Sequence, residues 1–71
     1  MRRADLLRRI ASAARVAGLR WELRRQGAEH EVWSLDGLRV VLPRHREINE
    51  RTAAKIMKNL EQKLGERWWL T

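Results

Sequence analysis

The chain is short and strongly basic: its 71 residues include 16 Lys and Arg but 9 Asp and Glu, for a formal net charge of +7. Such a small domain buries a thin core, which excludes a deep pocket for a large cofactor, so any chemistry is expected at the surface. The positive charge favours nucleic acid as a partner, because neutralising phosphates releases counterions. There is no cysteine and no apolar run of signal-peptide or membrane length, so we expect a cytoplasmic protein without a membrane partner.

The first predicted element is a helix over residues 4–17, where apolar residues recur at helical spacing and leave the arginines to water. Gly18 is a typical C-terminal stop for such a helix. Residues 19–24 then alternate between apolar and charged side chains, which predicts a half-buried strand, and Gln26-Gly27 ends it.

A β-hairpin is predicted next. Residues 30–35 and 38–42 have strand character and flank Asp36-Gly37, a strong signal for a two-residue turn in which Gly37 is the structural turn residue. Pro43 ends the sheet, because proline has no backbone N–H to donate to a neighbouring strand.

A second helix is predicted from Asn49, a suitable N-cap, with an apolar stripe that ends at Gly65. The element order is therefore α-β-β-β-α. This is an α+β fold, in which two helices lie on one face of a three-stranded antiparallel sheet. We expect a single domain over residues 1–65, followed by a Trp-rich tail over residues 66–71.

The two-residue turn sets the register of the hairpin. It pairs Trp33 with Val40 on the face with the bulkier apolar groups, which we expect to lie on the helices. His30 pairs with Pro43 on the opposite face and is expected to be exposed or half exposed, where an imidazole can transfer protons near neutral pH. A turn of another length would reverse the two faces, and two β-branched residues on the His30 face favour that alternative.

Two acidic residues, Glu29 and Glu31, flank His30 and raise the question of a metal site. Alternation along a strand sends His30 and its neighbours to different faces. We therefore expect no metal ligands and no cofactor.

Short motifs surround this histidine. They are Gly27-Ala28-Glu29-His30, the turn Asp36-Gly37, the strand end Leu42-Pro43-Arg44-His45, and Thr52 leading into Ile56 and Leu60. Together they resemble the HicA-type toxins of prokaryotic toxin–antitoxin modules. The resemblance covers nearly the whole chain, from the first helix to about Gly65.

This resemblance implies a double-stranded-RNA-binding-like fold and an mRNA interferase that cleaves RNA without a metal. The catalytic histidine of the family falls on His30, and a HicB-type antitoxin is the expected protein partner. The chain departs from the family at Ala28, where serine is common, so any hydrogen bond made by that hydroxyl is missing.

Basic residues around the hairpin and the second helix are expected to bind RNA phosphates, because double-stranded-RNA binders use shape and phosphate contacts rather than base readout. They are Arg24, Arg39, Arg44, Lys55 and Lys58. His45 lies between two arginines and is interpreted as a phosphate contact or a solvated residue rather than a second catalytic group.

The four tryptophans fall into two pairs. Trp21 and Trp33 alternate into the expected core, so stacking on RNA bases is the less favoured role for them. Trp68 and Trp69 lie in the tail, which has no counterpart in the family pattern. Both rings are not easily buried on an extended tail, so we expect an exposed aromatic pair that forms a protein interface. The alternative is that one of the two rings folds back to cap the second helix.

The sequence therefore predicts an endoribonuclease toxin. His30 acts as general base or acid while the RNA 2′-hydroxyl attacks the adjacent phosphate, and arginines stabilise the charge that develops. A non-catalytic nucleic-acid-binding module of the same fold, a decayed toxin, is an alternative that Ala28 favours. Another is an interaction protein whose basic face docks on an acidic partner.

Overall fold

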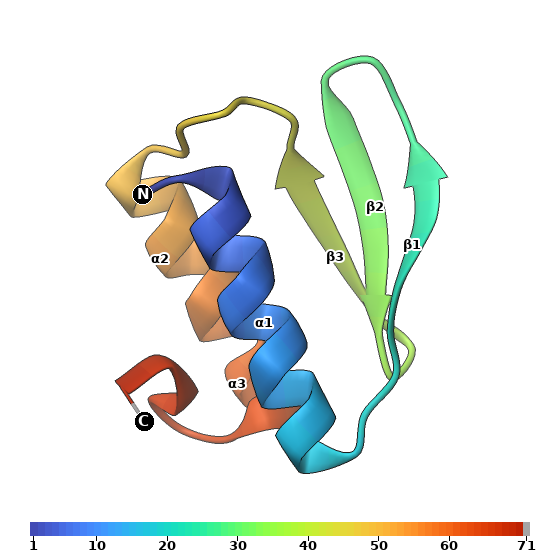
Figure 1. Ribbon diagram of the computed structural model, residues 1–71, viewed down its shortest axis with the longest axis vertical. Coiled ribbons are helices and arrows are strands. Elements are labelled where there is room, and N and C mark those ends of the chain that lie inside the picture. Colours follow the sequence, from blue (N-terminus) through green and yellow to red (C-terminus); the bar gives the residue numbers. More distant parts are fainter. Residues whose placement is uncertain (71) are drawn as a thin grey trace.

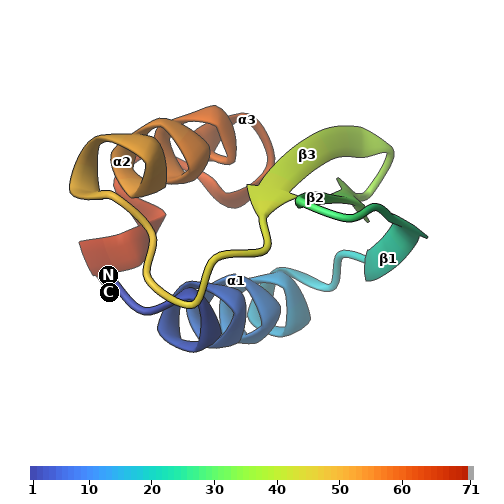
Figure 2. The same ribbon diagram turned by 90° about the horizontal axis from the view of Figure 1, so that it is seen from above.

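The computed structural model describes residues 1–70. Its elements are α1 (Arg3–Ala17), β1 (Trp21–Gln26), β2 (His30–Leu35), β3 (Leu38–Pro43), α2 (Glu50–Asn59), α3 (Glu61–Leu64) and the short 3₁₀ helix η1 (Trp68–Leu70). The strands form one antiparallel sheet in the order β1-β2-β3, and α1 and α2 lie on the same side of it (Figure 1 and Figure 2). The predicted α-β-β-β-α fold is confirmed. The predicted second helix is divided at Leu60 into α2 and α3, and η1 follows it.

The end of α1 and the beginning of α2 have local causes that the sequence carries. α1 stops where Gly18 adopts a left-handed conformation, with φ of 71°, as predicted for a C-terminal glycine. α2 begins at Asn49, whose side-chain oxygen accepts a hydrogen bond of 2.8 Å from the N–H of Arg51. Among the helices within residues 1–70, none has the length and apolar character that a bilayer span requires.

The core lies between the helices and one face of the sheet. It is an aliphatic cluster, closed at one end by a single tryptophan, and its buried members are Leu6, Ile10, Ala14, Leu35, Val40, Leu42, Ile48, Ala53, Ile56, Leu60 and Trp68. Because these residues come from α1, β2, β3, α2 and the C-terminal segment, every layer of the fold is needed to exclude water from the core.

The hairpin has the predicted register. Asp36 and Gly37 both have positive φ, 49° and 89°, which is the type I′ geometry of a two-residue hairpin turn. Trp33 therefore pairs with Val40, and His30 pairs with Pro43. Val40 is buried against the helices and the His30 side chain is exposed, so the predicted assignment of the two faces is confirmed.

The first strand departs from simple alternation. The pairing of β1 with β2 contains a β-bulge between Leu23 and Arg25, after which Arg25 pairs with Val32. A bulge inserts one extra residue and so reverses the faces that the following side chains occupy. Arg25 consequently shares the outer face of the sheet with His30, while Gln26 turns towards the helices.

The C-terminal segment folds back onto the domain. Trp68 is 7% exposed, and its Nε1 donates a hydrogen bond of 2.8 Å to the backbone carbonyl of Met57 in α2. Its ring meets that of Trp69 edge-on, with 5.9 Å between the centroids. Trp68 is therefore not exposed but folds back onto α2, which is the alternative that the sequence left open for one of the two rings. The turn is made by η1 and by the left-handed Arg67 before it. The last residue of the predicted tail, Thr71, lies outside the described residues.

Candidate functional site

His30 lies in a shallow pocket at the end of the β1–β2 loop. It is the first residue of β2, and the pocket has a volume of about 280 Å³. The residues that line it are Arg25, Gly27, Ala28, Glu29, His30 and Val32. The pocket is thus lined by a histidine, an arginine and a glutamate, all three of them exposed.

The backbone of the loop turns sharply next to the histidine. The N–H of Gly27 donates a hydrogen bond of 2.9 Å to the carbonyl oxygen of His30. A Cβ at Gly27 would lie 2.9 Å from that same oxygen, a separation that real side chains do not tolerate. The turn next to His30 therefore requires glycine at this position.

Arg44, the residue that follows β3, fixes the same loop. Its Nη1 donates to the carbonyl oxygen of Gly27 at 2.6 Å, and its backbone N–H donates to the carbonyl oxygen of Glu29 at 2.9 Å. The sequence predicted Arg44 as a phosphate contact. In the structure its guanidinium positions the loop that carries the histidine.

Glu31 is buried directly behind the pocket, on the helix-facing side of the sheet. It is 6% exposed, forms an ion pair with Arg3, and accepts hydrogen bonds from Trp33 Nε1 at 3.0 Å and from Gln26 Nε2 at 3.3 Å. Burial acts to raise the pKa of this carboxyl. The hydrogen bond from Trp33, the charge of Arg3, the hydrogen bond from Gln26 and the charge of Arg44 outweigh it and lower the pKa below its ordinary value.

The Glu31 network is a feature that the sequence analysis missed. An acidic residue at a core-facing strand position, two residues before a tryptophan, was the available signal. Its main partner, Arg3, lies on α1 and is joined to the sheet a second time, because its Nε donates to the carbonyl oxygen of Pro43 at 2.9 Å. Arg3 and the buried carboxylate of Glu31 therefore connect α1 to β2 and β3, the two strands that pair at His30 and Pro43.

Strand alternation predicts that both acidic neighbours of His30 lie on the opposite face of the sheet. This prediction is right for Glu31 and wrong for Glu29. Glu31 lies on the opposite face of the sheet, as alternation requires. Glu29 precedes β2, where strand alternation does not apply, and it lines the same pocket as His30. Among residues 1–70, no group of three or more His, Cys, Asp or Glu side chains is placed to hold a metal ion.

The predicted RNA-binding residues do not form one continuous track. Arg39 projects from the outer face of the sheet, whereas the exposed Lys55 and Lys58 lie on α2, on the other side of the sheet (Figure 2). Arg24 pairs with Glu22 at 3.0 Å. Arg25, which the sequence analysis did not select, is the basic residue of β1 that lines the His30 pocket, and the bulge that places it there has no sequence signature.

Comparison of the chain with models of known protein families, with curated proteins and with solved structures found no match. The resemblance to HicA-type toxins therefore rests on the motif residues themselves, and the function is a proposal.

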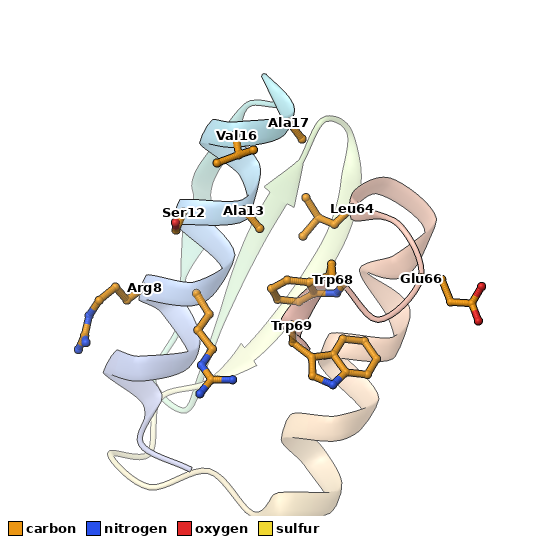
Figure 3. A pocket seen from close by; sticks show the side chains of 10 residues that line it. Arg8, Ser12, Ala13, Val16, Ala17, Leu64, Glu66, Trp68 and Trp69 are labelled. Atoms are coloured by element: carbon orange, nitrogen blue, oxygen red, sulfur yellow. The ribbon is translucent and has the colours of Figure 1, made fainter. Parts of the chain in front are cut away.

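A second, larger pocket of about 810 Å³ lies between α1 and the C-terminal segment (Figure 3). Ala13 of α1 faces Leu64 and Trp68 across it. Val16, at its rim, is 84% exposed, and Trp69 is half-buried. Of the two predicted interface tryptophans, Trp69 is the one whose ring remains accessible to a partner.

Proposed function

We propose that this protein is a metal-independent endoribonuclease, the mRNA-cleaving toxin of a HicA-type toxin–antitoxin pair, and that His30 is its catalytic residue. The observation that carries this proposal is an exposed imidazole in a shallow pocket whose loop is held on both sides by backbone hydrogen bonds. A catalytic group must be held in place by its surroundings, and the Gly27 and Arg44 contacts supply this support.

The shape and charge of the surface support RNA as the substrate. A pocket of about 280 Å³ is at the small end for sites that enclose a ligand. An open hollow of this size suits one phosphodiester linkage of a chain that lies across the surface. The net charge of +7 attracts that chain, since each phosphate contact releases counterions.

In the proposed reaction the 2′-hydroxyl of the RNA attacks the adjacent phosphorus, and the 5′-oxygen of the next nucleotide leaves. His30 transfers a proton in this step, and arginine guanidinium groups balance the extra negative charge on the phosphorane. Such a protein acts where mRNA is translated, which is why we propose a cytoplasmic location.

Cleavage of a defined mRNA transcript by the His30→Ala variant tests the proposal. We expect cleavage to fall by about 100-fold or more, the usual contribution of a general acid or base, while RNA affinity stays within a few fold. His45→Ala is the matched control, because His45 is also exposed but lies in the β3–α2 loop and does not line the pocket. As a phosphate contact or a solvated residue it has no role in proton transfer, so this variant should cleave within about threefold of wild type. EDTA should leave cleavage unchanged.

The opposite results separate the alternatives. Normal cleavage by His30→Ala, or inhibition of the wild-type protein by EDTA, contradicts the metal-independent histidine mechanism. RNA binding without any cleavage by the wild-type protein supports the second candidate, a non-catalytic nucleic-acid-binding module. Ala28 favours that candidate, because it lines the pocket with a methyl group where the toxin family commonly has a hydroxyl.

We further propose that an acidic antitoxin of the HicB type neutralises the protein by covering the His30 pocket and by a second contact with the C-terminal segment at the far end of the molecule, where Trp69 is an aromatic anchor (Figure 1). The net charge of +7 that attracts RNA also steers an acidic protein to this surface. Pull-down with the product of the neighbouring gene should give a complex in which RNA and antitoxin compete. Unchanged affinity in Trp69→Ala would restrict the interface to the hairpin, and the absence of any complex contradicts the toxin–antitoxin proposal.

A further inference from the structure

Cleavage of RNA by its own 2′-hydroxyl requires two proton transfers, one from the attacking oxygen and one to the leaving oxygen. His30 accounts for one of them. The second group must reach the same phosphate from the same pocket, so the candidates are the ionisable side chains that line it. These are Glu29 and Arg25. An arginine stays protonated and cannot accept the proton, which leaves the carboxylate of Glu29.

Glu29 and His30 line the same pocket, although consecutive residues of a strand point to opposite faces of the sheet. Glu29 is the last residue of the β1–β2 loop, so its side chain does not obey the alternation that begins at His30. Its backbone is fixed, because its carbonyl oxygen accepts the N–H of Arg44 at 2.9 Å. Within residues 1–70, the exposed carboxylate of Glu29 has no cation within 4.0 Å and accepts no hydrogen bond.

Arg25 supplies the positive charge of the same pocket. The β-bulge after Leu23 turns it to the outer face, where it pairs in register with Val32, two residues beyond His30. In the part of the chain that the structure describes, no carboxylate lies within 4.0 Å of its guanidinium. An uncommitted guanidinium suits a phosphate, because its N–H groups can bind two oxygens at once. It also offsets the repulsion between the phosphate and Glu29.

We propose that Glu29 is the general base and Arg25 the phosphate ligand of the cleavage site, with His30 as the general acid. This inference rests on the proposed ribonuclease function and assigns the group that function leaves open.

The proposed step balances as follows. The Glu29 carboxylate takes the proton of the 2′-hydroxyl, and the 2′-oxygen forms a bond to phosphorus. The bond from phosphorus to the 5′-oxygen breaks, and that oxygen takes a proton from the His30 imidazolium. The products are a 2′,3′-cyclic phosphate and a free 5′-hydroxyl, while Arg25 binds the non-bridging oxygens throughout. No water, metal or oxidant is consumed.

The test uses two RNAs of one sequence, chosen so that the wild-type protein cleaves at a mapped linkage. In the second RNA a sulfur replaces the bridging 5′-oxygen at that linkage. A thiolate leaves without a proton, so the sulfur substrate no longer needs a general acid but still needs a general base. Glu29→Gln should therefore cleave both RNAs about 100-fold or more slowly than wild type, as expected for loss of a general base. His30→Ala should be equally slow on ordinary RNA and recover to within about tenfold of wild type on the sulfur substrate.

Matched controls separate local chemistry from net charge. Glu66→Gln removes one exposed carboxylate in the loop before η1, at the far end of the molecule from the β1–β2 loop, and should cleave normally (Figure 1). Arg25→Ala should slow cleavage by about tenfold or more. Arg15→Ala removes the same charge from an exposed position on α1, and its cleavage rate should stay within about threefold of wild type. Circular dichroism verifies that each variant is folded.

The outcomes distinguish this inference from the proposed function. Cleavage by Glu29→Gln within threefold of wild type, with His30→Ala inactive, overturns the role of Glu29 and leaves the proposed function in place. Rescue of Glu29→Gln rather than His30→Ala by the sulfur substrate overturns the assignment of base and acid. A wild-type protein that cleaves no RNA, or an active His30→Ala, overturns both proposals.

Discussion

Replacing Glu31 with glutamine is expected to lower the free energy of unfolding by about 2–4 kcal/mol at neutral pH. The change keeps the shape of the side chain but exchanges one carboxylate oxygen for an amide NH₂. The amide oxygen can still accept the bonds from Trp33 and Arg3, which both end on Oε1, but the NH₂ cannot accept the bond from Gln26 that ends on Oε2. The neutral amide also leaves the Arg3 guanidinium without its counter-charge. Each bond to a charged group contributes about 1.5–3 kcal/mol, and the desolvation of the carboxylate, which the variant avoids, offsets part of the loss.

Such a loss is large for this domain, because a stability of about 0.05–0.15 kcal/mol per residue corresponds to roughly 4–10 kcal/mol in total. Urea unfolding followed by tryptophan fluorescence measures it. Glu29→Gln is the matched control, since it neutralises an exposed carboxylate two residues away and should change stability by less than about 0.5 kcal/mol.

The effect must also depend on pH. The pKa of Glu31 is lowered in the folded protein, so its stabilising contribution is fully present above the ordinary carboxyl pKa of 4.5 and is lost as the pH falls through the lower folded value. The stability difference between wild type and Glu31→Gln should therefore be constant from about pH 6 to 8 and shrink below about pH 4.5. Equal stability of the two proteins at pH 7, or a difference that does not change in acid, would refute the reasoning.

Other variants test the remaining parts of the structure. Trp68→Ala should lower the free energy of unfolding in urea by about 3–5 kcal/mol, because it empties a core position and removes the hydrogen bond to Met57. Trp69→Ala should lower it by less than half as much, and equal losses would contradict the packing of η1. Arg39→Ala should weaken RNA binding without changing sequence preference and should reduce the slope of log affinity against log salt by about one, as measured by titration at several salt concentrations; an unchanged slope would remove Arg39 from the phosphate contacts. Gly27→Ala should reduce cleavage by about tenfold or more even where the domain remains folded, since the added Cβ meets the His30 carbonyl oxygen at 2.9 Å, and full activity would show that the loop geometry is dispensable.

The features that the sequence alone determined are those with local causes. Asp36-Gly37 is suited to the positive φ angles of a two-residue turn, and this turn sets the hairpin register and hence the face on which His30 lies. Gly18 and Asn49 end and begin their helices through contacts within one turn of the chain. Such features can be read in sequence because the interacting groups are neighbours along the chain.

The features that the tertiary structure decided depend on residues far apart in sequence. Arg3 reaches Glu31 across 28 positions, and Trp68 reaches Met57 across 11, so neither partner is visible in a local pattern. The bulge beside Arg25 arises from the pairing of two strands rather than from a residue type, and it brings Arg25 to the face of the sheet where it lines the His30 pocket. A side chain's burial and partners follow from which elements pack together, and that packing is settled by the free energy of the whole core.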